Sequence, residues 1–278
     1  MILDGKLTAA TVRKQVAENV KRLNDTVTAA LIMVGDNQAS QVYVRNKQKA
    51  CDEVGINVES YLLEENTSQK ELLNIIDKCN KDPKINGILV QLPLPSHIEE
   101  KTVINAISPE KDIDGLNMVN QGKLMVGEEG LVPATPKGVI TLLKSNNIEI
   151  AGKNVVIVGR SKLVGKPLAM LMLKENATVT VAHSKTVNLK EVTKRADILV
   201  AAVGKAKFIT ADMVKRDAVV VDVGINRFDG KLCGDVDYQA VSEVAKFITP
   251  VPGGVGPMTI AELLENILKC YKIQHEMY

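Results

Sequence analysis

A tyrosine and a lysine four residues apart form the first pair whose spacing suggests chemistry. Tyr43 and Lys47 lie in a segment, residues 40–54, whose apolar residues recur at helical spacing, and both fall on the predicted face of Ala50, Cys51 and Val54. Two interpretations are open. The lysine extends its ammonium along its own stem to solvent, or it is held in a cleft with a lowered pKa, suited to proton transfer or to polarising a substrate.

A glutamine and two aspartates are further candidates. Gln91 directly follows a strand expected at residues 85–90, and ligands of open α/β sheets bind beyond the carboxyl ends of strands. Its carboxamide offers a donor and an acceptor there; the alternative is an ordinary loop residue. The segment Lys111-Asp112-Ile113-Asp114-Gly115 is consistent with an Asx turn or with a carboxylate aimed at a pair of heterocyclic N–H groups.

A glycine turn in the second half predicts a nucleotide site. The apolar run 155–158 ends at Gly159, Gly165 follows, and a helix continues from Leu168. Backbone N–H groups and the dipole at such a helix start hold phosphate. Arg160-Ser161 stands where the usual G-x-G-x-x-G fingerprint has its second glycine, so an ordinary strand-to-helix turn is the alternative.

The strand that follows favours NADP over NAD. Residues 177–182 lead into His183-Ser184-Lys185-Thr186, so no acidic residue stands where an NAD site holds the ribose 2′-hydroxyl. Hydroxyls, a histidine and a lysine suit a 2′-phosphate instead, together with Arg160 in the earlier turn. The sequence therefore predicts NADP as the cofactor.

The composition is that of a globular chain with room for two domains. It has 278 residues, a formal net charge of +2 and 3% aromatic residues, with no basic tract interleaved with aromatics, so nucleic acid is not an expected partner. Its four cysteines and three histidines are scattered, which predicts neither a disulfide framework nor a metal site. No apolar run approaches the roughly 20 residues of a membrane span. The N-terminus does not read as a signal peptide, and we expect a cytoplasmic location.

These side chains need parallel strands to bring them together. In the first half, strands expected at 28–34, 58–63 and 85–90 alternate with helices at 8–24, 40–54 and from Ser68 on, where Glu71 completes a capping box. Later strands are expected at 154–158, 177–181, 197–200, 218–223 and 247–249. We predict an α/β protein of two domains with a cleft between them: residues 1–140, closed by a C-terminal helix over 260–278, and residues 141–259.

Three connecting segments carry further expectations. Residues 117–131 contain glycine and are predicted to be irregular in structure. Thr135 is expected as the N-cap of a helix with Pro136 at its first position. The Pro/Gly-rich run 250–259 holds valine and methionine beside its prolines, unlike a flexible linker, and predicts a shaped loop over the cleft.

Read together, several stretches resemble one enzyme family. They are, in chain order, Tyr43-x-x-x-Lys47, Val90–Pro95, Lys111–Gly115, Gly159-Arg160-Ser161 with Val164–Pro167, His183–Thr186 and Pro250–Thr259. They resemble the bifunctional methylenetetrahydrofolate dehydrogenase/methenyltetrahydrofolate cyclohydrolase family. The resemblance extends from Asp4-Gly5 to the final helix, and the second and last stretches are highly specific to it.

The resemblance implies a homodimeric enzyme with a folate-binding, catalytic N-terminal domain and a Rossmann-like NADP-binding domain. It implies NADP-dependent oxidation of 5,10-methylenetetrahydrofolate, then hydrolysis of the methenyl product to 10-formyltetrahydrofolate, both in one cleft. Lys47 would be the catalytic residue of hydrolysis, tuned by Gln91, with Tyr43 packed on the folate and Asp114 anchoring the pterin. The other implied folate contacts are Ser40, Leu92, Pro252 and Gly253. The implied nucleotide contacts are Gly159, Arg160, Ser161, Val164, Ser184, Gly224, Ile225 and Thr259.

Two alternatives keep the fold and change the function. A monofunctional dehydrogenase would lack a competent Lys47–Gln91 pair, and a non-catalytic NADP-binding regulator would show erosion at Tyr43, Lys47, Gln91 or Asp114; all four are present. The family often carries cysteine where Ala134 and Ala182 stand, and neither thiol is needed for the chemistry. No formate-activating ligase domain is expected.

Overall fold

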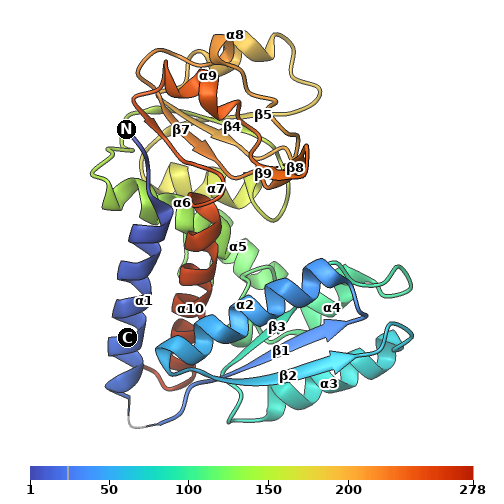
Figure 1. Cartoon of the computed structure of the whole chain (residues 1–278). Coiled ribbons are helices and arrows are strands. Elements are labelled where there is room, and N and C mark those ends of the chain that lie inside the picture. The colour runs from blue at the N-terminus through green and yellow to red at the C-terminus, as the bar shows by residue number, and fades with distance from the viewer. Residues whose placement is uncertain (24, 278) are drawn as a thin grey trace. The chain divides into compact units, whose positions relative to one another are not determined.

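The computed structural model describes residues 1–23 and 25–277, which group into two units (Figure 1). Unit 1 contains Met1–Ala10 and Pro133–Glu262, and unit 2 contains Thr11–Val132 and Leu263–Tyr278. The helix predicted over residues 8–24 is α1 (Gly5–Lys21). The helices predicted over 8–24 and 260–278 have their last residues, 24 and 278, outside the described part of the chain.

These units differ from the predicted ranges 1–140 and 141–259. The first ten residues belong to unit 1, where the backbone N–H of Leu3 donates to Ile248 O at 2.9 Å and that of Gly5 donates to Gly253 O at 3.0 Å. The helix α6 (Ala134–Ser145) also belongs to unit 1, since it packs against α7 (Gly165–Lys174).

The last part of the chain, from Leu263 on, belongs to unit 2. In α10 (Val255–Gln274), Asn266 Nδ2 donates to Ile113 O and to Val132 O, each at 2.8 Å. Farther along the helix, Gln274 Nε2 donates to Asn86 O at 2.6 Å. These bonds satisfy carbonyls of unit 2 that have no strand partner for them.

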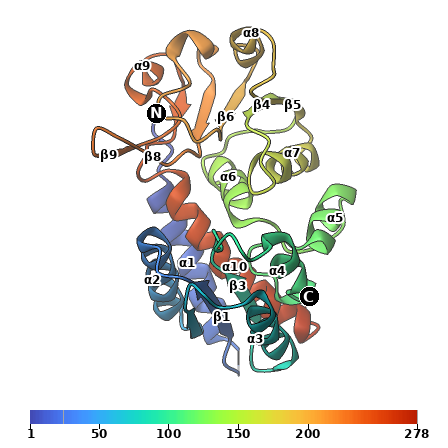
Figure 2. The same ribbon diagram turned by 90° about the vertical axis from the view of Figure 1, so that its right-hand side faces the viewer.

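Unit 2 is built on a parallel sheet with the strand order β2-β1-β3. Its strands are β1 (Thr28–Val34), β2 (Asn57–Leu63) and β3 (Gly87–Val90). The central strand β1 is buried along its whole length, as its continuous apolar sequence predicts. The helices α3 (Gln69–Lys81) and α4 (Glu100–Ala106) pack on Ala30, Ile32 and Val34, and α2 (Gln38–Val54) lies on the opposite face (Figure 2).

Both ends of α3 are closed by side chains. Ser68 Oγ accepts from the backbone N–H of Glu71 at 3.2 Å, so the predicted cap is present. At the other end, Lys111 Nζ donates to the carbonyls of Cys79, Asn80 and Asp82 at 3.1, 2.9 and 2.8 Å. Lys111 is only 5% exposed, and its burial lowers its pKa. The three N–H donors of the Lys111 ammonium thus satisfy carbonyls at the end of α3.

The prediction that residues 117–131 are irregular is wrong. They contain the helix α5 (Met118–Val126), which Asn117 caps by accepting from the backbone N–H of Val119 at 2.8 Å. Gly127 ends the helix in the left-handed conformation, with φ of 82°. The Asn117 cap and the Gly127 stop, ten positions apart, outweigh the low helix propensity of the interior Gly122.

Unit 1 contains a parallel sheet with the strand order β10-β7-β6-β4-β5. Its strands are β4 (Asn154–Val158), β5 (Thr178–Ala182), β6 (Ile198–Ala201), β7 (Val219–Asp222) and β10 (Phe247–Ile248). The helices α6 and α7 lie on one face, and α8 (Leu189–Thr193) and α9 (Tyr238–Ser242) lie on the other (Figure 2). The predicted α/β class is confirmed, and every predicted strand is present with ends within two residues.

A hairpin in unit 1 was not predicted. It consists of β8 (Asn226–Phe228) and β9 (Lys231–Cys233), which pair antiparallel. Asp229 and Gly230 connect the strands with φ values of 49° and 74°. An Asp-Gly pair with positive φ at both positions is a favoured two-residue hairpin turn.

Two helix starts in unit 1 also differ from prediction. Thr135 is not the N-cap of α6, which begins at Ala134 behind Pro133; its Oγ1 instead lies 2.9 Å from Thr259 Oγ1. The helix α10 begins at Val255, so only the first half of the predicted loop 250–259 is loop. Proline is tolerated in a first helical turn because the N–H groups there have no partner within the helix.

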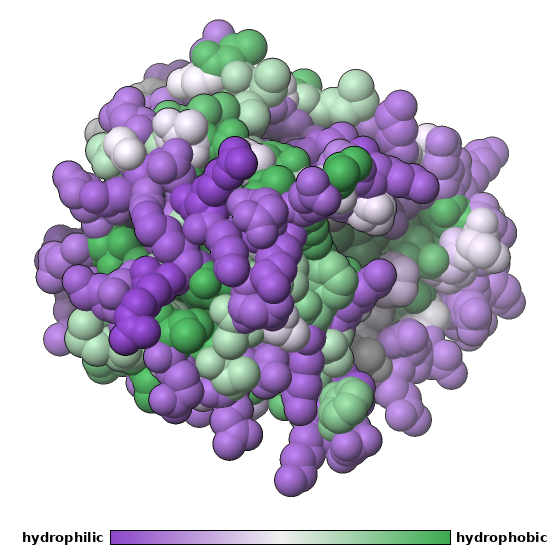
Figure 3. Space-filling view, turned by 90° about the horizontal axis from the view of Figure 1, so that it is seen from above, coloured by the Kyte–Doolittle hydropathy of each residue, from purple (hydrophilic) through white to green (hydrophobic). Residues whose placement is uncertain are grey.

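One face of the molecule is largely polar (Figure 3). Figure 3 shows one face covered mainly by hydrophilic side chains, with hydrophobic ones in small separate groups. In the described part of the chain, no helix is both long and apolar enough to cross a bilayer.

The three hydrogen bonds of Lys111 predict a large loss of stability in Lys111→Met. Three carbonyls at the end of α3 lose their donor, so the free energy of unfolding should fall by about 3 kcal/mol, measured by urea denaturation. The control is Lys84→Met, which changes an exposed lysine close to the same helix end and should cost less than about 0.5 kcal/mol. Equal losses in the two variants would contradict the capping role.

Candidate active site

The predicted catalytic residues lie at the carboxyl ends of the strands of unit 2. The chain passes from β1 to β2 on one side and places β3 on the other, so the strand order reverses beside β1. Ligands of parallel sheets bind at such a reversal. The helix α2, which carries Lys47, follows β1, and Gln91 follows β3.

Lys47 and Gln91 are joined by a hydrogen bond. Lys47 Nζ donates to Gln91 Oε1 at 3.0 Å, and Gln91 Nε2 donates to the carbonyl of Leu92 at 2.6 Å. The second bond fixes which end of the amide faces the lysine. Both side chains are half-buried, so the ammonium is held by a partner and is not extended alone into solvent.

Asp114 belongs to the same group of side chains. Burial raises the pKa of its carboxyl, and the positive charge of Lys47 acts in the opposite direction. Lysine, amide and carboxylate therefore lie near one another although the sequence separates Lys47 from Asp114 by more than 60 positions. This set can bind a heterocycle through the carboxylate and move a proton through the amine.

Asp112 and Asp114 have different environments. Asp112 is 1% exposed, and its Oδ2 accepts from the backbone N–H of Asn117 at 2.8 Å and from Asn120 Nδ2 at 2.9 Å. Burial raises the pKa of Asp112 to about 6. Of the two acids in the predicted motif, Asp112 holds the start of α5, and Asp114 is the one beside Lys47.

The other predicted folate contacts have varied exposure. Tyr43 lies one turn before Lys47 and is 47% exposed, so its ring is available to a ligand. Ser40 is 4% exposed, and its backbone N–H donates to the Asn37 cap of α2 at 3.1 Å. Pro252 and Gly253 belong to unit 1 and follow β10 there.

In unit 1 the glycine turn also lies where the strand order reverses, after β4. Gly159 has a φ of 134°, and a Cβ on it would collide with the carbonyl oxygen of Ala202. A Cβ on Gly165 would collide with Gly159 O. Ser161 Oγ accepts from the backbone N–H of Val164 at 3.1 Å, just before α7 begins. The chain is therefore compact here and presents backbone rather than side chains at a helix start, as a phosphate site requires.

The segment after β5 presents polar side chains to solvent. Ser184 and Lys185 are exposed, as is Arg160 in the glycine turn. His183 is fixed locally, since its backbone N–H donates to Thr186 Oγ1 at 2.8 Å and its Nδ1 accepts from the N–H of Lys185 at 3.2 Å. A cation and a hydroxyl thus stand where an NAD site has an acid, which fits a nucleotide with a 2′-phosphate.

The remaining predicted cofactor residues differ in how available they are to a ligand. Gly224 and Ile225 line a cavity of about 180 Å³ in unit 1 together with Pro252 and Gly253. Ile225 is 53% exposed. The hydroxyl of Thr259 is already in contact with Thr135 Oγ1 at 2.9 Å and donates to Val255 O at 3.4 Å.

Sequence reasoning missed two buried acids in unit 1, Asp222 and Asp235, which are 3% and 0% exposed. They hydrogen-bond to the loops that follow the strands. The available signals were an acid at the end of the apolar stretch Val219–Asp222 and an acid directly after Gly234.

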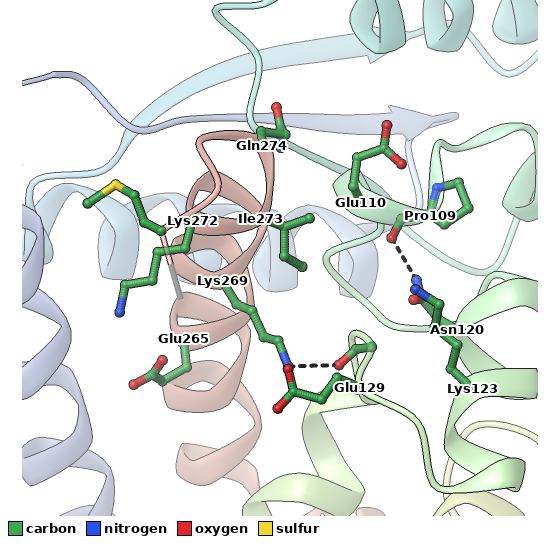
Figure 4. A pocket seen from close by; sticks show the side chains of 12 residues that line it. Pro109, Glu110, Asn120, Lys123, Glu129, Glu265, Lys269, Lys272, Ile273 and Gln274 are labelled. Atoms are coloured by element: carbon green, nitrogen blue, oxygen red, sulfur yellow. Dashed lines mark hydrogen bonds between the residues drawn. The ribbon is translucent and has the colours of Figure 1, made fainter.

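A larger cavity, of about 830 Å³, lies in unit 2 beside α10 and α5 (Figure 4). Its lining includes the charged residues Lys123, Lys269, Lys272, Glu110, Glu129 and Glu265, and none of the predicted site residues. Lys269 Nζ donates to Gly130 O at 3.0 Å. Lysines and glutamates are balanced in this lining, so the cavity shows no preference for a charged ligand. Elsewhere too, no group of three or more His, Cys, Asp or Glu residues is placed to hold a metal ion within the described ranges.

Comparisons with known proteins identify both halves of the chain. The family model of the tetrahydrofolate dehydrogenase/cyclohydrolase catalytic domain matches residues 3–114, and that of the NAD(P)-binding domain of the same family matches residues 133–275. The bifunctional protein FolD of Halalkalibacterium halodurans is 55% identical over 275 residues, which cover 98% of this chain and 99% of that protein.

Two solved structures are similar over nearly the full length. The bifunctional FolD enzyme of Campylobacter jejuni has a TM-score of 0.96 and 47% identity, covering 98% of this chain and 99% of that one. The FolD of Trypanosoma brucei, complexed with NADP cofactor and an inhibitor, has a TM-score of 0.92 and 36% identity, covering 98% and 97%.

Because the pKa of Asp112 is raised, we predict that ionisation of its carboxyl destabilises the folded chain as the pH rises. Its pKa is about 6 in the folded chain, against 3.8 for a fully solvated aspartate, so the folded chain binds the proton more tightly than the unfolded chain does. The stabilisation is present below pH 4 and lost as the pH rises through 6, by about 3 kcal/mol in total. In Asp112→Asn this loss should disappear from the free energy of unfolding measured between pH 4 and 7. Asp36→Asn, at an exposed carboxylate, is the control and should follow the wild type; a wild-type curve parallel to that of Asp112→Asn would contradict the assignment.

Proposed function

The chain belongs to the tetrahydrofolate dehydrogenase/cyclohydrolase family, and from that premise we propose that it catalyses two consecutive reactions. The first is NADP-dependent oxidation of 5,10-methylenetetrahydrofolate to the methenyl compound, and the second is hydrolysis of that product to 10-formyltetrahydrofolate. The observation that supports this best is the 3.0 Å hydrogen bond between Lys47 Nζ and Gln91 Oε1, beside Asp114.

Hydrolysis requires proton transfer. Water adds to the methenyl carbon and releases one proton; the bond from that carbon to one nitrogen then breaks, and that nitrogen takes the second proton as the formyl C=O forms. Lys47 Nζ is the group that we propose handles the released proton. Gln91 accepts from it and is itself fixed by the carbonyl of Leu92, so the amine has a defined direction. A side chain held in this way loses less entropy on reaching the transition state.

Oxidation needs alignment more than acid–base chemistry. Bound NADP supplies the acceptor for the hydride that leaves the methylene carbon. That carbon carries no O–H group, so no side chain has to remove a proton in this step. The glycine turn at Gly159 and Gly165 fits the nucleotide because neither position has room for a side chain, and exposed Arg160 and Ser184 supply polar contacts.

The remaining assignments are part of the same proposal. Tyr43 packs on the folate, Asp114 anchors the pterin, and Ser40 and Leu92 complete the site in unit 2; the exposure of Tyr43 and the position of the half-buried Asp114 beside Lys47 support these roles. Pro252 and Gly253 are proposed as further folate contacts. Val164, Gly224, Ile225 and Thr259 are proposed as further nucleotide contacts. The single shared cleft, the homodimer and the cytoplasmic location remain predictions.

The alternatives, a monofunctional dehydrogenase and a non-catalytic regulator, lose support. The monofunctional dehydrogenase required that the Lys47–Gln91 pair not be competent, and these two side chains are hydrogen-bonded. The regulator required erosion at one or more of four site residues, and all four are present: Tyr43, Lys47, Gln91 and Asp114.

Lys47→Met tests the hydrolytic role. The variant keeps a side chain of similar length without the amine, so methenyl hydrolysis should fall by about 10²-fold or more. Reduction of NADP with methylenetetrahydrofolate should continue in part, so methenyl product should accumulate in the absorbance assay. The control is Lys49→Met, an exposed lysine on the same helix, which should keep both activities. Undiminished hydrolysis in Lys47→Met would remove Lys47 from the mechanism.

Arg160→Ala tests how the cofactor is recognised. Loss of the guanidinium should raise KM for NADP by about tenfold or more and leave KM for NAD nearly unchanged, because only NADP carries the 2′-phosphate. Lys174→Ala, which removes an exposed cation at the far end of α7, is the matched control. Equal changes in KM for the two nucleotides would show that Arg160 does not recognise the 2′-phosphate.

A further inference from the structure

The carboxylate of Asp235 accepts hydrogen bonds from a loop about 30 residues earlier in unit 1. Its Oδ2 accepts from the backbone N–H groups of Val203 and Gly204 at 2.6 and 3.0 Å, and its Oδ1 accepts from that of Lys205 at 2.8 Å. Its Oδ1 also accepts from Asn226 Nδ2 at 2.9 Å. A fully buried carboxylate thus binds three successive N–H groups of the loop after β6 and one side chain that follows β7.

Asp222 performs a similar task at the end of β7. Its carboxylate accepts from the backbone N–H groups of Gly224, Asp235 and Val236 at 3.0, 2.9 and 2.9 Å. Its own backbone N–H donates to Thr249 Oγ1 at 2.7 Å, and Thr249 is the first residue after β10. Asp222 therefore links the end of β7 both to the segment of Asp235 and to the start of the loop 250–254.

Together the two acids connect the carboxyl ends of three neighbouring strands, since β10, β7 and β6 are adjacent in the sheet. The packing is tight at two glycines beside them. A Cβ on Gly224 would collide with Asp235 Oδ1, and one on Gly234 would collide with Asp222 Oδ2. Gly224 and Ile225, both proposed cofactor contacts, lie in the segment that the acids hold.

We propose that Asp222 and Asp235, the carboxylate clamp, are positioning residues for the cofactor. They fix the backbone at 203–205 and 224–226 so that this edge of the sheet is preformed when NADP binds. The inference rests on the proposed function for the identity of the nucleotide. It does not rest on either catalytic step.

The chemistry explains why acids occupy these positions. An ionised carboxylate has two oxygens and accepts from several N–H donors at once, and bonds to a charged acceptor are stronger than neutral ones. Asparagine has one accepting oxygen, and its NH₂ group would face N–H donors. Burying a carboxylate is costly, so four N–H donors on Asp235 and three on Asp222 are what make these sites stable.

The test compares NADP binding with an activity proposed to depend on unit 2. In Asp235→Asn the dissociation constant for NADP, measured by calorimetry, should rise by about tenfold or more, while methenyl hydrolysis should change by less than about twofold. Asn226→Ala removes one donor and leaves the backbone bonds in place, so it should raise the constant by about threefold. The control is Asp229→Asn, at an exposed acid in the turn of the nearby hairpin, which should bind NADP as the wild type does.

Each outcome is decisive. NADP affinity within about twofold of wild type in Asp235→Asn would overturn the proposal, as would parallel losses of affinity, hydrolysis and stability, which would indicate a purely structural role. If Asp235→Asn does not fold, Asn226→Ala decides: a weaker affinity supports the clamp, and an unchanged one overturns it. If wild type binds NADP but catalyses neither reaction, the proposed function fails while the calorimetric comparison still tests the clamp.

Discussion

Parallel strand pairing is the constraint on which the rest of each unit depends. Since the strands of a parallel sheet point the same way, the loops that follow them gather at one edge. In unit 2 this places Lys47 on the helix after β1 next to Gln91 after β3. In unit 1 it gathers the glycine turn, Ser184 and the segment at Gly224. Each site is therefore assembled from residues far apart in the chain.

Segments outside the strands lack the hydrogen bonds of a strand ladder, and this chain supplies them with buried charges. Lys111 satisfies three carbonyls at the end of α3, and Asp112 satisfies donors at the start of α5. Asp222 and Asp235 satisfy backbone N–H groups after β6 and β7. A charge buried among several backbone partners fixes a loop more firmly than contacts between neutral groups, which suits sites that need alignment.

What could be predicted from the sequence was local or periodic. The four-residue spacing put Tyr43 and Lys47 on one helix face, and the end of an apolar run placed Gln91 at a strand end. Within Lys111–Gly115, however, spacing could not tell which aspartate is structural and which lies beside Lys47. The role of Asp235 was also hidden, because its donors at 203–205 lie 30 residues earlier and no periodicity encodes a bond between a side chain and a distant backbone. The helix α5 was missed because its Asn117 cap was overlooked.

The most direct test of the bifunctional account is a time course with the wild-type chain, methylenetetrahydrofolate and NADP. NADPH, the methenyl compound and 10-formyltetrahydrofolate would be quantified in the same samples. The account predicts that NADPH equals the sum of the two folate products throughout, and that the formyl product appears faster than the methenyl compound hydrolyses without protein. NADPH matched by methenyl product alone, with formyl formation only at the uncatalysed rate, would contradict it.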